Sequence, residues 1–336
     1  IPLFLAIFLV IINITLKKFD ISLDKISIGE EHKSLLRSDN STPLSGTYFF
    51  LPIVLFLFFQ SDFIVVIFCS LFFLLGLLSD LKIVSSYKFR LLVQFLFLSL
   101  LFFISKEITI STRITFIENL MNYDLTRILI CTFFFMVMIN GFNLIDGTNC
   151  LCPLNILIIT IFIFLLIKNL NINFINNELY ILIISLKIFV LFNFFGKNFL
   201  GDGAAYGLSF LVGYILVKIA IIDITISPYF VANLLWYPAF ENLFSILRRN
   251  FSNKNNYLPD NYHLHQLIFK YLKVKKFINK TFLLSSFVGI IINIVLLIFY
   301  YIGYIFYNHT ITQIVLILSG IFLYLITYYI LRSKLK

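Results

Sequence analysis

Ile128-Leu-Ile-Cys-Thr-Phe-Phe-Phe-Met-Val-Met-Ile139, followed at once by Asn140-Gly-Phe-Asn-Leu-Ile-Asp-Gly-Thr-Asn149, is the stretch that decides the fold. A run this apolar predicts a helix inside a membrane. The polar residues after it recur every third position, which lines them along one side of a helix end. Lipid does not solvate a carboxylate, so this row must face protein, water or a ligand. The simpler alternative is a helix end that reaches water. The row consists of Asn140, Asn143, Asp146 and Asn149.

The rest of the chain resembles that run in composition. Of its 336 residues, 60% are hydrophobic and only 12% are charged, which excludes an ordinary soluble domain. We therefore expect an all-α polytopic membrane protein with about 10–11 transmembrane helices, in one membrane domain over residues 1–336. The apolar segments are 1–16, 44–59, 63–78, 89–105, 127–140, 151–167, 179–195, 205–222, 229–247, 277–302 and 313–331.

Lys and Arg are unevenly divided between the two sides of this predicted membrane. One side carries 20 of the 26, in loops 17–43, 79–88, 141–150, 196–204 and 248–276, their helix ends and the tail 332–336; the other side carries 4. Because basic loops stay in the cytoplasm, we expect these loops inside and the N-terminus outside. The net charge of +10 follows from this topology and calls for no nucleic acid.

Two other patterns lie outside the apolar segments. Residues 107–116 alternate partially, which predicts a short strand or hairpin at the outer surface. Cys150 and Cys152 stand two apart beside the polar row, but without further Cys or His nearby they indicate packing rather than a metal site.

The stretch 79–94, which follows the third segment and enters the fourth, contains Asp80, Arg90 and Gln94. Arg90 and Gln94 are one helical turn apart, so both can face the same site. The alternative is a basic flank whose long side chains reach the membrane surface.

The loop before the eighth segment reads Gly196-Lys197-Asn-Phe-Leu-Gly201-Asp202-Gly203. A Gly-Asp-Gly turn that opens a helix offers free backbone N–H groups and a positive dipole end to phosphate. Asp202 could hold Mg²⁺, which prefers carboxylate and phosphate oxygens. The alternative is a helix start capped by an acidic residue.

The longest basic loop, 248–276, begins with Arg248 and Arg249 and contains His263 and His265. Two histidines without a third ligand do not favour zinc. Contact with phosphate or sugar suits so basic a loop, and a solvated charged loop is the plain alternative.

Three charges fall inside apolar segments: Lys187, Lys218 and Glu241. Each is expected to point into the helix bundle. They mark either a transport path or structural pairs, and the sequence leaves this choice open.

Carboxylates, amides and cations thus gather on one predicted membrane face, as a phosphorylated soluble substrate meeting a lipid requires. A transporter concentrates its site near the midplane instead. From about residue 30 to 270 the motifs and their order resemble the polyprenyl-phosphate N-acetylhexosamine-1-phosphate transferases, which start O-antigen, teichoic acid and peptidoglycan lipid intermediates.

Four motifs carry the resemblance. Ser79-Asp80 with Arg90-Leu-Leu-Val-Gln94 is similar to the family's Asp-Asp motif and its following Lys/Arg-x-x-x-Gln, and Asn140–Asn149 to its Asn-x-x-Asn-x-x-Asp-Gly. Asn193 with Phe199-Leu-Gly-Asp202-Gly203 is similar to Asn…Phe-Met-Gly-Asp, and Pro259-Asp260 with His263-Leu-His265-Gln266 to Pro-Asp…His-x-His-His.

The resemblance implies an enzyme of the bacterial inner membrane. Its substrates would be a UDP-N-acetyl sugar such as UDP-N-acetylglucosamine and undecaprenyl or another polyprenyl phosphate, and its products polyprenyl-diphospho-sugar and UMP, for lipopolysaccharide or cell-wall synthesis. Mg²⁺, or Mn²⁺ in its place, would be the cofactor. The lipid bilayer is a further expected partner, and the oligomeric state, a homodimer included, stays open.

The resemblance also implies roles for residues. Asp202 would be the main metal ligand, with Asp146 close to the metal and beside Asn143 in the nucleotide-diphosphate site. Asp80 would lie near the attacking lipid phosphate, and Arg90 would act in the same catalytic group. His263 and His265 would contact the sugar or the diphosphate. The remaining substrate-binding candidates are Asn140, Asn149, Asn193, Lys197, Gly201, Gly203, Arg248 and Arg249.

The chain departs from the family pattern at three positions. Ser79 replaces the first Asp of the Asp-Asp motif, Asn149 replaces a second Asp after the Asp-Gly pair, and Gln266 replaces a third histidine. Ser79 motivates the alternative of a catalytically degenerate relative that binds lipid or nucleotide without turnover. A membrane transporter that uses the three intramembrane charges is the other alternative.

Overall fold

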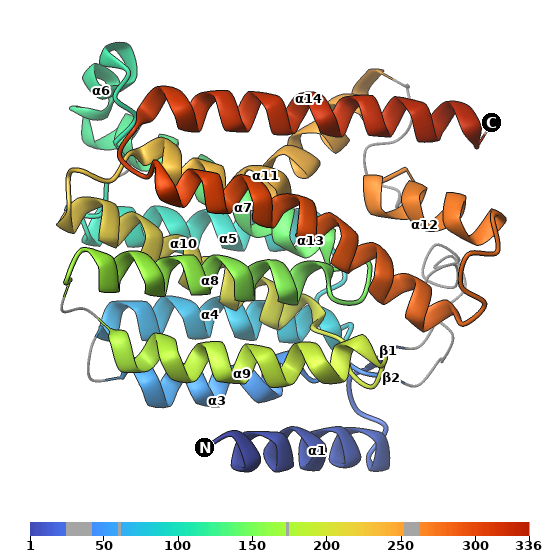
Figure 1. Ribbon diagram of the computed structural model, residues 1–336. Helices are drawn as coiled ribbons and strands as arrows, with labels where there is room; N and C mark the ends of the chain where they lie inside the picture. Colours follow the sequence, from blue (N-terminus) through green and yellow to red (C-terminus); the bar gives the residue numbers. More distant parts are fainter. Residues whose placement is uncertain (25–41, 60–61, 110, 173–174, 252–261, 336) are drawn as a thin grey trace.

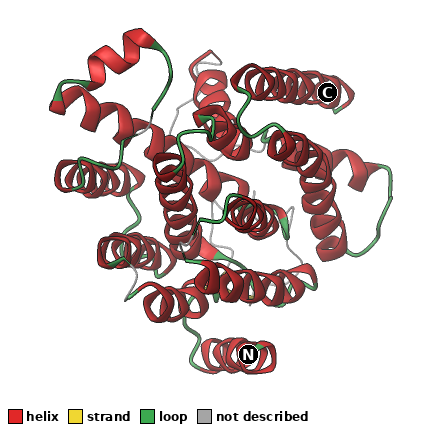
Figure 2. Cartoon of the chain, turned by 60° about the vertical axis from the view of Figure 1, so that its left-hand side comes forward, coloured by secondary structure: helices red, strands yellow, loops and turns green. Residues whose placement is uncertain are grey.

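The computed structural model describes residues 1–24, 42–59, 62–109, 111–172, 175–251 and 262–335 (Figure 1). Helices dominate these residues (Figure 2). They are α1 (Pro2–Lys18), α3 (Gly46–Phe58), α4 (Phe63–Asp80), α5 (Tyr87–Ile104), α6 (Thr115–Met121), α7 (Asp124–Ile145), α8 (Leu151–Asn169), α9 (Asn176–Phe194), α10 (Gly201–Ile222), α11 (Pro228–Phe251), α12 (Leu264–Val274), α13 (Thr281–Ile305) and α14 (Thr310–Lys334).

Each of the eleven predicted apolar segments coincides largely with one of these helices, which confirms the predicted all-α membrane fold. Within the described residues, eight helices are long and apolar enough to cross a membrane: α4, α5, α7, α8, α9, α10, α13 and α14. Two helices, α6 and α12, lie in segments that the sequence analysis treated as loops.

The predicted strand or hairpin at residues 107–116 is wrong for the part of it that the structure describes. The reason is a side chain from the next helix: the Glu118 carboxylate accepts hydrogen bonds from the backbone N–H groups of Thr112 and Arg113 and from the Thr112 hydroxyl. A carboxylate thus takes the donors that a partner strand would need.

The described strands are instead β1 (Leu23–Asp24) and β2 (Thr42–Pro43), an antiparallel pair. Leu44, directly after β2, forms a parallel bridge with Phe199, just before α10. This contact joins the chain between α1 and α3 to the start of α10.

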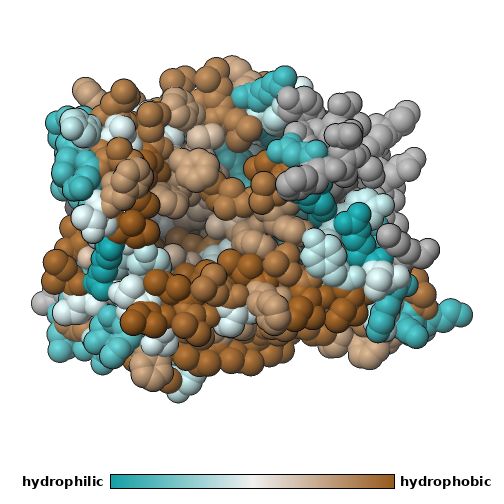
Figure 3. Space-filling view, turned by 90° about the horizontal axis from the view of Figure 1, so that it is seen from above, coloured by the Kyte–Doolittle hydropathy of each residue, from teal (hydrophilic) through white to brown (hydrophobic). Residues whose placement is uncertain are grey.

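The long helices run side by side, and the two ends of the chain lie at opposite ends of the bundle (Figure 1). β1, β2 and α12 mark one end, called here the site end, and α6 lies at the other. From above, hydrophobic side chains form a broad band between two more hydrophilic ends (Figure 3). That distribution suits a bundle whose middle lies in lipid and whose ends lie in water.

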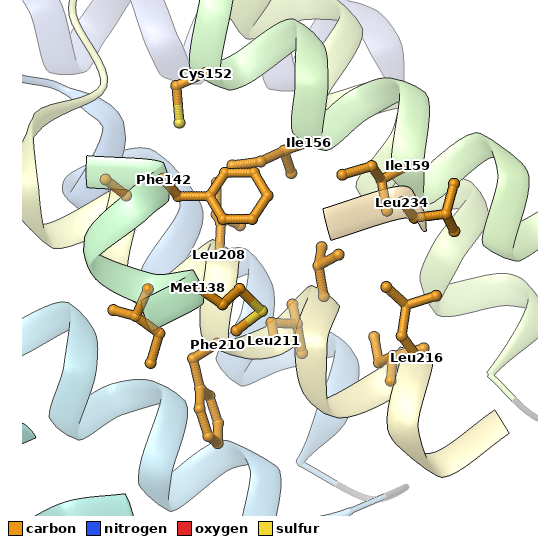
Figure 4. Close-up of a cluster of buried hydrophobic side chains, with 14 of the residues drawn as sticks. Met138, Phe142, Cys152, Ile156, Ile159, Leu208, Phe210, Leu211, Leu216 and Leu234 are labelled. Atoms are coloured by element: carbon orange, nitrogen blue, oxygen red, sulfur yellow. The ribbon is translucent and has the colours of Figure 1, made fainter. Parts of the chain in front are cut away.

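α10 lies at the centre of this bundle and is buried along most of its length. Its side chains meet those of α7, α8 and α11 in an apolar cluster (Figure 4). The labelled members of that cluster are Met138, Phe142, Cys152, Ile156, Ile159, Leu208, Phe210, Leu211, Leu216 and Leu234. The start of α10 is therefore held in place by packing with its neighbours.

Glycines let α4 and α10 approach backbone to backbone at the site end. A Cβ atom added to Gly76 on α4 would overlap the backbone of Gly203 on α10, and one added to Gly203 would lie 2.9 Å from the carbonyl oxygen of Phe73. This close approach places Asp80, the last residue of α4, beside the first turn of α10.

The intramembrane charges separate into different environments. Lys218 forms an ion pair with Asp62 at the end of the bundle opposite the site, and the Tyr214 hydroxyl donates to the same carboxylate at 3.1 Å. Glu241 is fully buried, as predicted. The prediction for Lys187 is wrong: it is exposed on α9, because a long stem lets a lysine lie along an apolar surface without entering the bundle.

Candidate active site

Two carboxylates cap the N-terminus of α10. The Asp80 side chain accepts hydrogen bonds from the backbone N–H groups of Asp202, at 2.9 Å, and Gly203, at 3.2 Å. The Asp146 side chain accepts one from the N–H of Gly201 at 3.3 Å. The free N–H groups of a helix start and its positive dipole end stabilise negative charge, so this turn holds both carboxylates in place.

The expectation that these N–H groups are free for phosphate is therefore corrected. In the structure Gly201 and Gly203 direct their N–H groups at protein carboxylates. Gly201 also has a φ of +81°, and a Cβ there would lie 2.7 Å from Asp80 Oδ2. A glycine is needed at position 201 both for its backbone conformation and for the space that the carboxylate occupies.

The third carboxylate, Asp202, is turned toward side chains of three other helices. Asn143 Nδ2 donates to its Oδ1 at 2.7 Å. Its Oδ2 accepts from the Ser79 hydroxyl at 2.7 Å and from the Arg90 guanidinium at 2.6 Å. Arg90 also donates to Ser79. Helices α4, α5, α7 and α10 thus meet at one acidic centre neutralised in part by Arg90.

The polar row at the end of α7 is confirmed for its first three members. Asn140 donates to Gln94 Oε1 at 2.7 Å, Asn143 reaches Asp202, and Asp146 accepts from Gly201. The prediction that Arg90 and Gln94 face the same site is also confirmed, since Gln94 holds Asn140 while Arg90 holds Asp202.

Asn149 leaves this row and packs against α13. Its backbone N–H donates to the Ser285 hydroxyl at 3.0 Å, and its side chain is buried near Ser286. α7 ends at Ile145, so the helical spacing that aligns the first three members does not extend to position 149.

Asn193 is a connector between loops rather than a member of the acidic centre. Its Oδ1 accepts from the Cys150 N–H at 2.6 Å and its Nδ2 donates to the Asn198 carbonyl at 2.7 Å. Lys197 is exposed, with its ammonium 6.0 Å from the centre of the Phe195 ring. Burial raises the pKa of the Cys150 thiol to about 12, which suits packing and not metal binding.

The two histidines stack on each other, and one of them lies against the residue that follows Asp146. Their rings are nearly parallel, with centroids 5.6 Å apart and an angle of 5° between the planes. A Cβ on Gly147, next to Asp146, would lie 2.6 Å from His265 Nε2. His265 is 1% exposed, and neither of its ring nitrogens has a hydrogen-bond partner among the described residues. The structure therefore brings the histidines to the acidic centre through His265.

Burial lowers the pKa of His265 to about 3, and the neighbouring His263 acts in the same direction. His265 is therefore a neutral imidazole with one donor and one acceptor at physiological pH. Such a ring suits a hydroxyl or amide of a sugar better than a phosphate.

Arg248, the first basic residue of segment 248–276, makes structural contacts between helices. Arg248 on α11 donates to the Tyr262 carbonyl and to Ser245, and lies against the Phe244 and Tyr328 rings, so it joins α11 to α14 and to the chain before α12. Arg249 is the next residue along α11. Pro259 and Asp260 lie outside the described residues.

Three residues make contacts at or near the site that the sequence did not predict. Ser79, noted only as a departure, bonds both Asp202 and Arg90. Gln266, noted as a missing histidine, accepts the His263 backbone N–H at 3.2 Å and so caps α12. Tyr324 on α14 donates to Glu241, and nothing in its local sequence distinguishes it from the other tyrosines of that helix.

The donor chemistry of the acidic centre fits Mg²⁺. Asp202 and Asp146 offer carboxylate oxygens, and no described group of three or more His, Cys, Asp or Glu side chains could hold a metal alone. Mg²⁺ is commonly bound by one or two carboxylates plus waters and substrate phosphates, so two carboxylates are a sufficient protein contribution to such a site.

Comparison with known proteins supports one assignment. No curated protein matches the chain. The family model for glycosyl transferase family 4 matches residues 63–220. That range runs from α4 to α10 and contains all three carboxylates, Arg90 and Asn143. This match supports membership of glycosyl transferase family 4, and the long apolar helices indicate a multi-pass membrane protein.

Proposed function

We propose that this transferase moves an N-acetylhexosamine-1-phosphate, or a deoxy derivative of it, from a UDP-sugar to undecaprenyl or another polyprenyl phosphate. The products are a polyprenyl-diphospho-sugar and UMP. The observation that carries this proposal is the convergence of Asp80, Asp146, Asp202 and Arg90 at one end of an apolar bundle. A water-soluble diphosphate and a lipid phosphate can meet only at such an end.

The bond changes of the reaction balance without a separate proton acceptor. An oxygen of the lipid phosphate attacks the β-phosphorus of the UDP-sugar, and the bond from that phosphorus to the bridging oxygen breaks. UMP leaves with the bridging oxygen and its charge. Because a phosphate monoester is largely ionised near neutral pH, the serine at position 79 does not prevent the attack.

The chain's own residues orient the two phosphates. Arg90 can bind a phosphate oxygen through its guanidinium, and it lies beside Asp202, where both side chains are partly exposed. Asn143 and Asp146 contact the nucleotide part of the UDP-sugar, and the neutral His265 contacts its sugar. Asp80, fixed by two backbone N–H groups, keeps the first turn of α10 in place beneath them.

Asp202 and Asp146 would hold Mg²⁺, or Mn²⁺ in its place. When bound, such an ion neutralises charge on the diphosphate and on the departing phosphate. The active-site end is assigned to the cytoplasm by the excess of Lys and Arg on that side, in a bacterial inner membrane.

The proposal is tested by UMP release from purified protein given a panel of UDP-N-acetyl sugars. Release is expected only with both polyprenyl phosphate and Mg²⁺, and mass spectrometry of the lipid identifies the sugar. Asp202→Asn should lower turnover by at least about a hundred-fold, the size typical of losing a main electrostatic group. Asp223→Asn, at the other end of α10 with its carboxylate bonded to Thr225, is the matched control. Absence of UMP with every donor would refute the proposal.

A degenerate relative that binds without turnover is the second candidate, and Ser79 is the observation that favours it. Its hydroxyl takes the position of an acid that relatives carry, and it bonds Asp202 and Arg90. If wild-type protein releases no UMP and Ser79→Asp does, this candidate is correct and the proposed activity of the natural chain is wrong.

A further inference from the structure

A fully buried carboxylate lies inside the bundle, away from the acidic centre. Glu241 on α11 is 0% exposed. Its Oε2 accepts a hydrogen bond from the Tyr324 hydroxyl of α14 at 2.7 Å, and its Oε1 lies 3.0 Å from His263 Nδ1, at the start of α12. Three separate helices thus meet at this one side chain.

Replacing a whole buried pair of charged or polar groups by well-packed apolar residues is often neutral or stabilising, so the pair by itself is weak evidence for a stabilising role. The geometry of the contact is more specific. Glu241 provides an acceptor aimed at one particular nitrogen, Nδ1 of His263. An ionised carboxylate has no proton to donate, so the proton of this hydrogen bond belongs to the imidazole.

The His263 ring is connected to the acidic centre through its contact with the His265 ring. His265 stacks on His263 almost in parallel. His265 Nε2 in turn lies against Gly147, the neighbour of Asp146. Both nitrogens of the buried His265 ring lack a partner among the described residues, as a ring kept for a ligand would.

We infer that Glu241, held by Tyr324, is a positioning residue for the histidine pair. It fixes His263 with a proton on Nδ1, and the stacked ring contact sets the plane of His265 beside the Asp146–Gly147 turn. This assignment rests on the proposed function, because the ligand that His265 meets there is the sugar of the UDP-sugar donor.

The first test measures the protonation of the rings and needs no activity. The chain has four histidines, so ¹⁵N-histidine labelling gives a spectrum with few signals, and His263→Asn identifies the signal of His263. In wild type that signal should be of the Nδ1-protonated type. Glu241→Gln keeps an oxygen acceptor and should preserve it, whereas Glu241→Leu should convert it to the Nε2-protonated form that free histidine prefers.

The second test measures function and stability together. Glu241→Leu should lower kcat/KM for the UDP-sugar by about 10- to 100-fold, as the loss of a supporting hydrogen bond behind a ligand-binding histidine does. Glu241→Gln should lower it by only about five-fold, because a neutral hydrogen bond replaces a charged one. Glu241→Leu should also lower the melting temperature, because His263 and Tyr324 lose their acceptor, whereas Glu241→Gln should stay close to wild type.

Tyr324→Phe removes one of the two hydrogen bonds to Glu241 and should lower kcat/KM by about three- to ten-fold. Its matched control is Tyr300→Phe, a fully buried tyrosine of α13 whose hydroxyl bonds Asn155 away from the site. The control should leave kcat/KM and the His263 signal unchanged.

The outcomes separate the two proposals. A wild-type His263 signal of the Nε2-protonated type overturns the positioning role, whether or not the protein turns over. The positioning role is also overturned if the Leu and Gln variants lose the same kcat/KM and show the same drop in melting temperature, because that result indicates a purely structural role. Failure to release UMP, with the expected tautomer change intact, overturns the proposed function and leaves the contact between Glu241 and His263 established.

Discussion

Replacing Arg90 by Met is expected to tighten metal binding and to slow turnover at the same time. In the structure the Arg90 guanidinium lies 2.6 Å from Asp202 Oδ2, the oxygen that a divalent cation would also seek. The guanidinium and the metal therefore compete for one carboxylate. Turnover falls because the same guanidinium is the cation placed to hold a substrate phosphate.

The size of the competition follows from the geometry. Two unit charges about 4 Å apart interact by about 4 kcal/mol at an effective dielectric constant near 20. The side chains of Arg90 and Asp202 keep 21% and 31% of their exposure, so water screens the pair. Screening brings the difference down to about 1–2 kcal/mol, or roughly a five- to thirty-fold tighter dissociation constant.

Mn²⁺ titration followed by electron paramagnetic resonance, with Mg²⁺ as competitor, measures this constant directly. Turnover is measured on the same preparations as UMP release. Arg127→Met is the matched control, because Arg127 pairs with Asp124 at the opposite end of the bundle, at 3.2 Å. It should change neither quantity at the acidic centre. Unchanged or weaker metal binding in Arg90→Met would refute the competition, and full turnover would refute the phosphate role.

Three further substitutions test the packing and the charges. Gly76→Ala adds a Cβ that overlaps the backbone of α10 and should cost about 1–3 kcal/mol, seen as a lower melting temperature in detergent; an unchanged value would show that α4 and α10 can separate without loss. Partial burial acts to raise the pKa of Glu118, but hydrogen bonds from residues 111–113 outweigh it and hold that pKa below its ordinary 4.5. The ionised form therefore stabilises the fold above that pH, and the gain is lost as the pH falls; Glu118→Gln should remove this acid limb from a pH series of melting temperatures, and its persistence would locate the effect elsewhere. Lys218→Met leaves the Asp62 carboxylate without its ammonium and should cost about 1–3 kcal/mol, whereas the same change combined with Asp62→Asn should cost less; equal losses would mean that the pair is not coupled.

The fold was largely predictable because lipid imposes one strong rule on sequence. A helix must stay apolar over its span, so runs such as Ile128–Ile139 mark α7 without reference to any partner. α12 escaped prediction because it is short and amphipathic, with its apolar residues spread among basic ones in a loop. The strand expected over residues 107–116 did not form in its described part because the carboxylate of Glu118, on the helix that follows, accepts the backbone hydrogen bonds instead.

The candidate site was predictable where one helix carries the spacing. Asn140 and Asn143 face the site together because they are one turn apart on α7, and Arg90 and Gln94 do so on α5. Beyond the end of a helix the same spacing no longer predicts which side chains share a face, and Asn149 packs against α13 instead.

Contacts between distant segments were not predictable from spacing at all. Ser79 meets Asp202 only because glycines let α4 and α10 touch, and Tyr324 meets Glu241 only because α14 packs on α11. The family motifs predicted which acidic residues belong to the site. They did not predict that backbone N–H groups at the start of α10 donate to Asp80 and Asp146.

The hydrogen bond from Tyr324 to Glu241 has a consequence for how the protein is made. The three carboxylates of the acidic centre, Arg90 and α10 precede α11 in the chain, whereas the hydroxyl that donates to Glu241 comes from α14. A nascent chain can therefore complete its acidic centre early, and this hydrogen bond only after α14 is inserted. Under the positioning role proposed for Glu241, the order of synthesis delays the final orientation of the histidine pair until α14 packs on α11.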